Sequence, residues 1–111
     1  MKAAYIEQTG GPEVIQFGDL PDPVPGEGEV RVRVGAASVN PIDTYMRGGM
    51  VAAELPLPFV VGSDLAGVVE AVGEGVAEWK IGDRVWGANQ GGHGRQGTAA
   101  ELACVGADWL H

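Results

Sequence analysis

The side chains of this chain that could do chemistry gather in one short stretch, VNPIDTYMRGG, residues 39–49. An amide, a carboxyl, a phenol and a guanidinium group lie close together there, on Asn40, Asp43, Tyr45 and Arg47. A phenol hydroxyl and an amide can orient a polar ligand, or stabilise charge that develops on a carbonyl oxygen, if both are directed at one point. Asn40 and Tyr45 are therefore candidates for a reaction site.

The same stretch also has the pattern of a short helix. Asn40 followed by Pro41 is typical of a helix N-cap and first helical position, because asparagine accepts from free backbone N–H groups and proline lacks the N–H that would stay unpaired there. We predict a helix over residues 41–47. Asn40 and Tyr45 lie about 140° apart around an ideal helix axis. They could meet one ligand only at the N-terminal end or along one edge.

Helical spacing gives a structural interpretation of the remaining side chains. Ile42 and Met46 form an apolar i,i+4 pair. Asp43 and Arg47 have the same spacing and could be a surface ion pair, worth only about 0.3–0.5 kcal/mol. Spacing alone favours this interpretation over a reaction site, and it leaves open whether Asn40 caps the helix or turns to a ligand.

Length and composition limit the classes of protein to which the chain can belong. Its 111 residues suffice for one domain, and 45% hydrophobic residues with 19 glycines and 7 prolines fit a globular domain rich in turns. The formal charge of −8 argues against a nucleic-acid partner, because such proteins carry a basic surface for phosphates. No apolar run approaches the roughly 20 residues that span a bilayer, so we expect a cytoplasmic protein that does not enter a membrane.

The single cysteine, Cys104, excludes an internal disulfide and any metal site made of several cysteines. We expect it to be a small buried apolar residue in a strand.

Short strand-like segments recur between turn signals. They cover residues 2–8, 13–20, 28–39, 65–73, 83–88 and 98–106, and this spacing predicts an all-β barrel or sandwich with a little helix. In residues 29–34 the valines alternate with arginines, which is typical of a strand with one buried face. Residues 87–101 contain five glycines but no strand-then-helix frame, so they are not a dinucleotide-binding fingerprint.

Residues 57–87, LPFVVGSDLAGVVEAVGEGVAEWKIGDRVWG, taken with VNPIDTYMRGG, resemble the medium-chain dehydrogenase/reductase superfamily, specifically its zinc-free quinone oxidoreductase (zeta-crystallin-like) branch. The resemblance covers nearly the whole chain. It implies that residues 1–111 are a GroES-like catalytic domain, mainly β (α+β), a partly open β-barrel with one or two short helices. In the complete enzyme such a domain precedes a Rossmann NADP-binding domain, which is absent from this chain.

The chain departs from the zinc-dependent branch of the superfamily at the metal positions. That branch has a cysteine ligand near the position of Asn40 and a His-Glu pair where this chain has Ser63 and Asp64. Its structural zinc lobe uses four cysteines, whereas the corresponding region here, residues 88–99, holds only His93. Since a zinc site needs three or four ligands, we predict no zinc.

Carried over position by position, Tyr45 matches the family's tyrosine beside the nicotinamide, and Asn40 and Asp43 match polar groups in the same cleft. These three are the predicted catalytic residues, with Tyr45 and Asn40 also contacting the cofactor. The neighbouring substrate side is occupied by Arg47, Met50 and Val51.

By resemblance the reaction is hydride transfer from NADPH to a quinone or another conjugated carbonyl compound, such as an enone. Without a metal, the negative charge on oxygen would be stabilised by the Tyr45 hydroxyl, the Asn40 amide or a water molecule. An alternative within this class is a zinc-free alkenal or enoyl reductase, and an alternative outside it is a stand-alone GroES-like interaction module. We expect the 111-residue chain by itself to be inactive and to bind no NADPH, and we expect a homo-oligomer.

Overall fold

The computed structural model describes residues 1–50 and 55–111, which form seven strands, one α-helix and two 3-10 turns. The strands are β1 (Lys2–Ile6), β2 (Gln16–Asp19), β3 (Glu29–Ala36), β4 (Phe59–Val60), β5 (Leu65–Val72), β6 (Arg84–Gly87) and β7 (Leu102–Gly106). The helix is α1 (Pro41–Gly48), and the 3-10 turns are η1 (Pro12–Val14) and η2 (Ala107–Trp109). The predicted class, mainly β with short helices, is confirmed.

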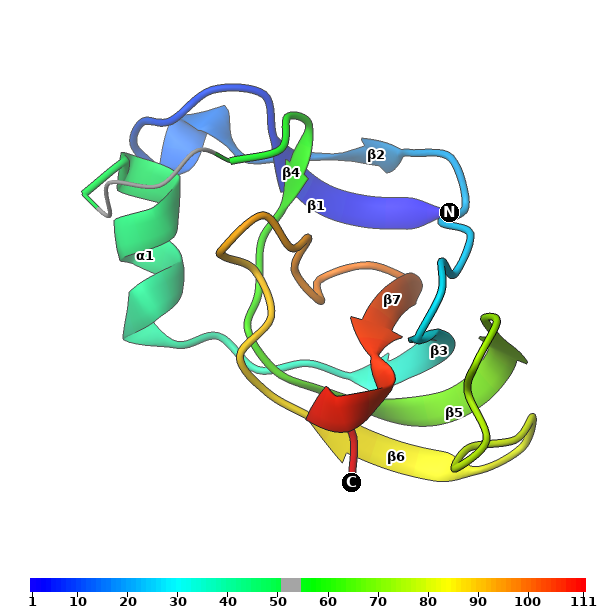
Figure 1. Cartoon of the computed structure of the whole chain (residues 1–111). Coiled ribbons are helices and arrows are strands. Elements are labelled where there is room, and N and C mark those ends of the chain that lie inside the picture. The colour runs from blue at the N-terminus through cyan, green and yellow to red at the C-terminus, as the bar shows by residue number, and fades with distance from the viewer. Residues whose placement is uncertain (51–54) are drawn as a thin grey trace.

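The strands form two antiparallel sheets that do not close into a complete barrel (Figure 1). One sheet has the strand order β2-β1-β4, and the other has the order β6-β5-β3-β7. Residues just before β7 connect the two sheets, because the Ala4 N–H donates to the carbonyl of Ala99 (2.8 Å) and the Glu101 N–H donates to that of Lys2 (2.9 Å). This open arrangement is the partly open barrel that the resemblance to the GroES-like domain implies.

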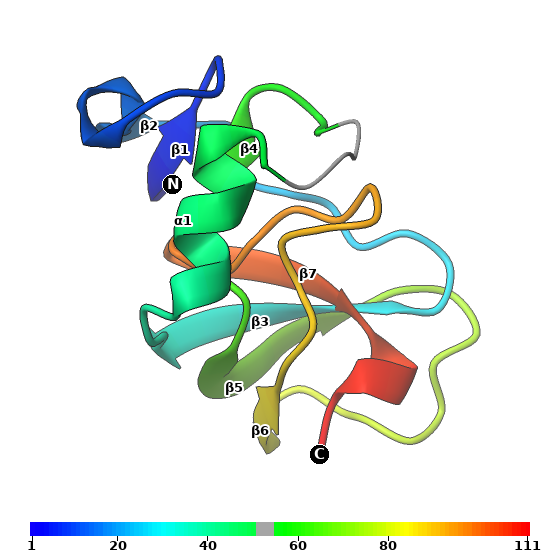
Figure 2. The same ribbon diagram turned by 90° about the vertical axis from the view of Figure 1, so that its left-hand side faces the viewer.

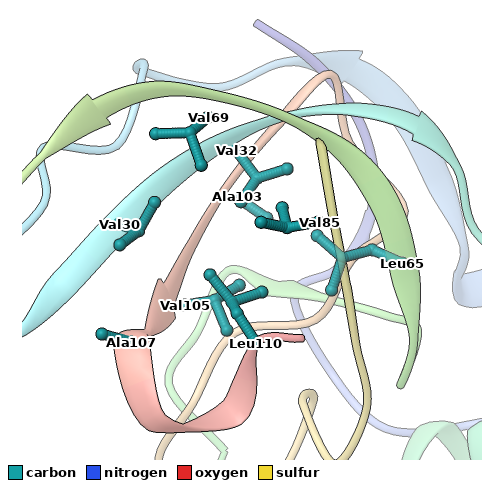
Figure 3. Packing of buried hydrophobic residues seen from close by; sticks show 9 residues of the cluster. All are labelled: Val30, Val32, Leu65, Val69, Val85, Ala103, Val105, Ala107 and Leu110. Atoms are coloured by element: carbon teal, nitrogen blue, oxygen red, sulfur yellow. The ribbon is translucent and has the colours of Figure 1, made fainter. Parts of the chain in front are cut away.

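The core lies on one face of the four-stranded sheet and follows from the alternation of its strands. Val30 and Val32 of β3 are completely buried, while Arg33 between β3's apolar positions is exposed. The predicted half-buried strand is therefore confirmed. Figure 3 shows the side chains that meet there: Val30, Val32, Leu65, Val69, Val85, Ala103, Val105, Ala107 and Leu110.

A second, smaller cluster joins α1 to the three-stranded sheet. Met46 of α1 packs with Ile6 of β1 and Phe59 of β4, and all three are buried. Figure 2 shows α1 upright beside the sheets, with its C-terminal end next to β1 and β4 and its N-terminal end near the end of β3. The helix therefore spans the side of the molecule from one sheet to the other.

Cys104 lies in β7 and is only partly buried. Burial, with Glu29 nearby, raises the pKa of the Cys104 thiol to about 11. The side chain is therefore a neutral thiol at physiological pH, in keeping with a structural residue.

Some predicted elements differ from those observed. The predicted strand over residues 13–20 is a 3-10 turn followed by the short strand β2, because Pro12 begins a turn in which the Ile15 N–H donates to the Pro12 carbonyl. The strand predicted over 98–106 pairs continuously only from Leu102. The two-residue strand β4 carries no alternation that could have identified it.

Gly73 follows β5 at a point where two backbone segments almost touch. A Cβ atom on Gly73 would lie 1.9 Å from the carbonyl oxygen of Gly26 and 2.8 Å from that of Glu29. We expect Gly73→Ala to lower the free energy of unfolding by about 1–3 kcal/mol, since backbone must move to admit the methyl group. Urea unfolding of the purified chain measures this. Gly35→Ala is the matched control, because its Cβ would meet only the Ala66 carbonyl oxygen, at 3.5 Å. Equal stabilities of the two variants would contradict the prediction.

Candidate active site

The backbone at the N-terminal end of α1 follows the predicted pattern. Asn40 is the N-cap and Pro41 the first helical residue. The Asn40 N–H donates to Oδ2 of Asp43 (2.8 Å), and the Asp43 N–H donates to the Asn40 carbonyl (2.9 Å). The helix ends at Gly48 and is followed by Gly49, whose φ of +77° is in the left-handed region that favours glycine. The predicted helix over 41–47 is confirmed, one residue longer at its C-terminal end.

The Asn40 side chain is held by a residue far away in sequence. Its Nδ2 donates to Oδ2 of Asp64, which stands just before β5, over 3.1 Å. Ser38 contacts the same carboxylate twice: its N–H donates to Oδ1 (3.0 Å), and its hydroxyl lies 2.8 Å from Oδ1 and 2.9 Å from Oδ2. Ser38, Asn40 and Asp64 therefore form one hydrogen-bonded group, which we call the Asp64 network.

These hydrogen bonds change the ionisation of Asp64. The Ser38 backbone N–H, and then the Ser38 hydroxyl and the Asn40 amide, lower the pKa of the Asp64 carboxyl, although partial burial opposes the shift. The lowered pKa means that the network contributes stability above the ordinary pKa of aspartate, and that this contribution is lost as the pH falls through the lowered pKa. At neutral pH Asp64 is a carboxylate that only accepts hydrogen bonds.

Tyr45 lies farther along α1, and 46% of its surface is exposed. Among the described residues its hydroxyl has no hydrogen-bond partner, in contrast to Tyr5, whose hydroxyl lies 3.4 Å from Oε1 of Gln16. A tyrosine hydroxyl that the fold leaves exposed and unpaired can donate to a ligand oxygen. The structure therefore places Tyr45 as an accessible donor.

The other predicted site residues have different surroundings. Arg47 donates from Nε to the Gly10 carbonyl (3.3 Å), whereas the Asp43 carboxylate accepts from Asn40. The alternative that Asp43 and Arg47 form an ion pair is wrong: of the ion pairs between described residues, none joins these two. Both side chains have nearer backbone partners, and these replace the pairing that spacing suggested. Met50 is highly exposed, and Val51 lies outside the described residues.

A hollow of about 420 Å³ lies between α1 and the glycine-rich loop that follows β6. Ile42 and Met46 form its apolar side, and Ser63, Asn89 and Arg95 contribute polar atoms. Gln90 and His93 line it as well, so apolar and polar side chains share its wall. A hollow of this size that offers both kinds of contact could receive a small molecule. Another hollow, of about 400 Å³, lies by Pro21 and Leu102. None of the predicted site residues that the structure describes lines either hollow.

The positions that hold metal ligands in the zinc-dependent branch come together here as well. Asn40 and Asp64 are hydrogen-bonded to each other, and Ser63 precedes Asp64. They offer one carboxylate and no thiolate or imidazole, and within residues 1–50 and 55–111 no three His, Cys, Asp or Glu side chains gather in a way that could hold a metal ion. In the same ranges no helix is long and apolar enough to cross a membrane.

Sequence reasoning did not include Ser38 and Asp64 among the site residues. Ser38 lies in the connection from β3 to α1 and shows no motif of its own. The signal for Asp64 was present, because the resemblance matched Asn40 and the pair Ser63–Asp64 to ligands of one metal centre, which implies that they lie side by side.

Comparison with known proteins places this geometry in a family. The model of the alcohol dehydrogenase GroES-like domain matches residues 26–111. A quinone oxidoreductase of Lama guanicoe is 41% identical over 104 residues, which cover 91% of this chain and 32% of that protein. A 2-haloacrylate reductase of a Burkholderia species is 42% identical over 87 residues, 75% of this chain and 26% of that protein.

A solved structure shows the same fold. The Escherichia coli quinone oxidoreductase complexed with NADPH has a TM-score of 0.89 and 33% identity, and the match covers 100% of this chain and 32% of that one. The chain thus spans about a third of the length of the curated relatives that it matches.

Proposed function

The chain belongs to the family of alcohol dehydrogenase GroES-like domains, and from this premise we propose that it is the N-terminal catalytic domain of a zinc-independent NADPH:quinone oxidoreductase. The observation that carries the proposal is the site at α1. Tyr45 of this helix is half exposed, and its hydroxyl has no hydrogen-bond partner among the described residues. Ile42 and Met46 of the same helix line a hollow, and the chain is 41% identical to a quinone oxidoreductase.

The described residues fit the nicotinamide end of NADPH better than its phosphates. The exposed Tyr45 hydroxyl and the Asn40 amide are polar groups suited to a carboxamide and to a carbonyl oxygen. The glycine-rich loop after β6 is irregular, and it does not lead from a strand into a helix as a pyrophosphate-binding turn does. When bound, NADPH would supply the hydride and thus both electrons of the reduction.

The chain's own residues would then bind the acceptor and stabilise charge. We propose that the apolar side of the hollow, Ile42 and Met46, contacts the ring of a quinone. As hydride adds to the conjugated system, negative charge develops on a carbonyl oxygen, and the Tyr45 hydroxyl would donate a hydrogen bond to it. A proton from solvent completes the hydroquinone. The Asn40 amide would orient the ligand, and Asp43 would act through the helix cap.

A second candidate function is reduction of a conjugated carbon–carbon double bond. The similarity to a 2-haloacrylate reductase favours it, because that name describes an unsaturated carboxylic acid as substrate. Both reactions add hydride to an acceptor conjugated with a carbonyl group, and both place charge on an oxygen. The two candidates therefore share the site and differ in the acceptor.

Steady-state assays of the natural polypeptide that carries this domain test the proposal. We expect NADPH oxidation with ortho-quinones to be faster than with α,β-unsaturated aldehydes or acids, and to persist after dialysis against a chelator, because the described site offers too few ligands for a metal. Faster rates with the unsaturated acids would favour the second candidate. Loss of the quinone activity with the chelator and its recovery with zinc would contradict zinc independence, and no rate with either acceptor would contradict the proposed function.

A further inference from the structure

The amide of Asn40 has a fixed orientation, and the cause lies in another part of the chain. Asn40 precedes α1, whereas Asp64 precedes β5, and the two are 24 residues apart in sequence. Only Nδ2 of the amide can donate, and it is this atom that lies 3.1 Å from Oδ2 of Asp64. If the amide were turned over, its oxygen would face a carboxylate oxygen and the two would repel each other. Asp64 therefore fixes the orientation of the Asn40 amide, with its nitrogen facing the carboxylate.

The carboxylate that holds Asn40 is itself held. Ser38 donates to Asp64 from its N–H, over 3.0 Å to Oδ1, and from its hydroxyl, which lies 2.8 Å from Oδ1 and 2.9 Å from Oδ2 and so shares its one proton between the two oxygens. Carboxylates that accept several hydrogen bonds have little rotational freedom, and charge-assisted bonds of this kind are stronger than neutral ones. Ser38 and Asn40 are two residues apart in sequence, and both donate to Asp64. The carboxylate and the amide therefore hold each other in a single arrangement.

We infer that Asp64 is a positioning residue of the active site: it fixes the plane of the Asn40 amide, whose nitrogen also lies 3.4 Å from the Ser38 hydroxyl, so that the amide oxygen meets a bound ligand in one direction. This inference rests on the proposed function, in which Asn40 contacts the ligand. It extends the proposed site by Asp64, a residue that does not itself contact the ligand. The lowered pKa of Asp64 agrees with it, because the group remains an acceptor at any pH near neutrality.

A purely structural role would have different consequences. Asp64 also connects the N-terminal end of α1 to β5, so its loss could weaken the fold without any effect through Asn40. The two roles differ in one respect. If Asp64 acts through Asn40, removing it has no further effect on catalysis once the Asn40 amide is gone, whereas independent contributions add.

A double-mutant cycle in the natural polypeptide distinguishes the two roles. We expect Asp64→Asn and Asn40→Ala each to lower kcat by about tenfold or more, since a small misplacement of a ligand-positioning group is costly, with little change of KM. In the Asn40→Ala background, Asp64→Asn should have no further effect on kcat. Additive losses, or an Asp64→Asn variant with full activity, would overturn the inference. Asp19→Asn is the matched control, because Asp19 at the end of β2 forms an exposed ion pair with Lys2 of β1, away from the Asp64 network.

A spectroscopic measurement on the 111-residue chain tests the orientation without any activity. The chain has two asparagines, Asn40 and Asn89, besides four glutamines, so only two asparagine side-chain amide pairs have to be assigned. We expect slow hydrogen exchange for the Asn40 pair, and faster exchange in Asp64→Ala, while the Asn89 pair is unchanged. Unchanged exchange of the Asn40 pair in a folded Asp64→Ala variant would overturn the inference.

The two experiments separate this inference from the proposed function. A natural polypeptide that reduces neither quinones nor unsaturated acids would contradict the function, and the exchange measurement would still show whether Asp64 holds the amide. Full activity of Asn40→Ala would remove Asn40 from the site, and with it the positioning role of Asp64. Activity that depends on Asn40 but not on Asp64 would overturn the inference alone.

Discussion

Replacing Tyr45 by phenylalanine is expected to lower kcat for quinone reduction by on the order of 10²- to 10³-fold in the natural polypeptide, the loss typical of removing one donor to a developing oxyanion. Tyr45 is the strongest candidate for this donor, because its hydroxyl is half exposed and has no partner among the described residues. Asn40, by contrast, already donates to Asp64. The measurement is steady-state kinetics at saturating NADPH, with kcat and KM determined separately.

Two controls accompany the Tyr45 variant. Tyr5→Phe removes the chain's other tyrosine hydroxyl, which lies on β1 near Gln16, and should leave kcat unchanged. Thermal unfolding of Tyr45→Phe should match the wild type, since an exposed hydroxyl without a partner contributes little to the fold. A Tyr45→Phe variant with wild-type kcat would exclude the hydroxyl as the oxyanion donor, and the Asn40 amide or a water molecule would take its place.

Replacing Phe59 by alanine is expected to lower the free energy of unfolding by about 3–5 kcal/mol, because it removes a buried aromatic ring and leaves a cavity. Phe59 is 1% exposed and packs with Ile6 and Met46, so the cavity would open directly beneath α1. The loss should be measured by urea unfolding. Hydrogen exchange should show faster opening of the α1 amides than of those in β3, since α1 depends on this small cluster and β3 lies in the larger core.

The chain's other phenylalanine provides the control. Phe17 on β2 is 77% exposed, and Phe17→Ala should change the free energy of unfolding by less than about 0.5 kcal/mol. Equal losses for the two variants would show that the cluster of Ile6, Met46 and Phe59 does not hold α1 in place.

Local sequence signals were sufficient for the elements that depend on neighbouring residues. The Asn40–Pro41 pair predicted the start of α1 because a cap and a proline act on the next few backbone groups only. Alternation of Val30 and Val32 with arginine predicted β3, since the period of two is a property of the strand itself.

Contacts between distant segments could not be predicted in this way. Spacing suggested that Asp43 pairs with Arg47, but Asp43 accepts from Asn40, and Arg47 turns to Gly10, 37 residues earlier. The strand β4 exists because Val60 and Phe59 pair with β1, and two residues are too few to show a period. The catalytic and ligand-binding roles of Tyr45, Asn40, Asp43, Arg47, Met50 and Val51 remain predictions, and the variants above test those of Tyr45 and Asn40.

The attachment of α1 at its two ends has a mechanical consequence. At its C-terminal end the Gly10 N–H donates to the Arg47 carbonyl (2.9 Å), which ties the helix to the segment after β1. At its N-terminal end Asn40 is tied through Asp64 to β5, in the other sheet. If one sheet shifted against the other, α1 would move as a rigid body. Asn40 and Tyr45 would keep their separation, because both belong to this helix and its N-cap. We therefore expect the distance between Asn40 and Tyr45, the two proposed ligand contacts, to stay constant when the two sheets of the open barrel move relative to each other.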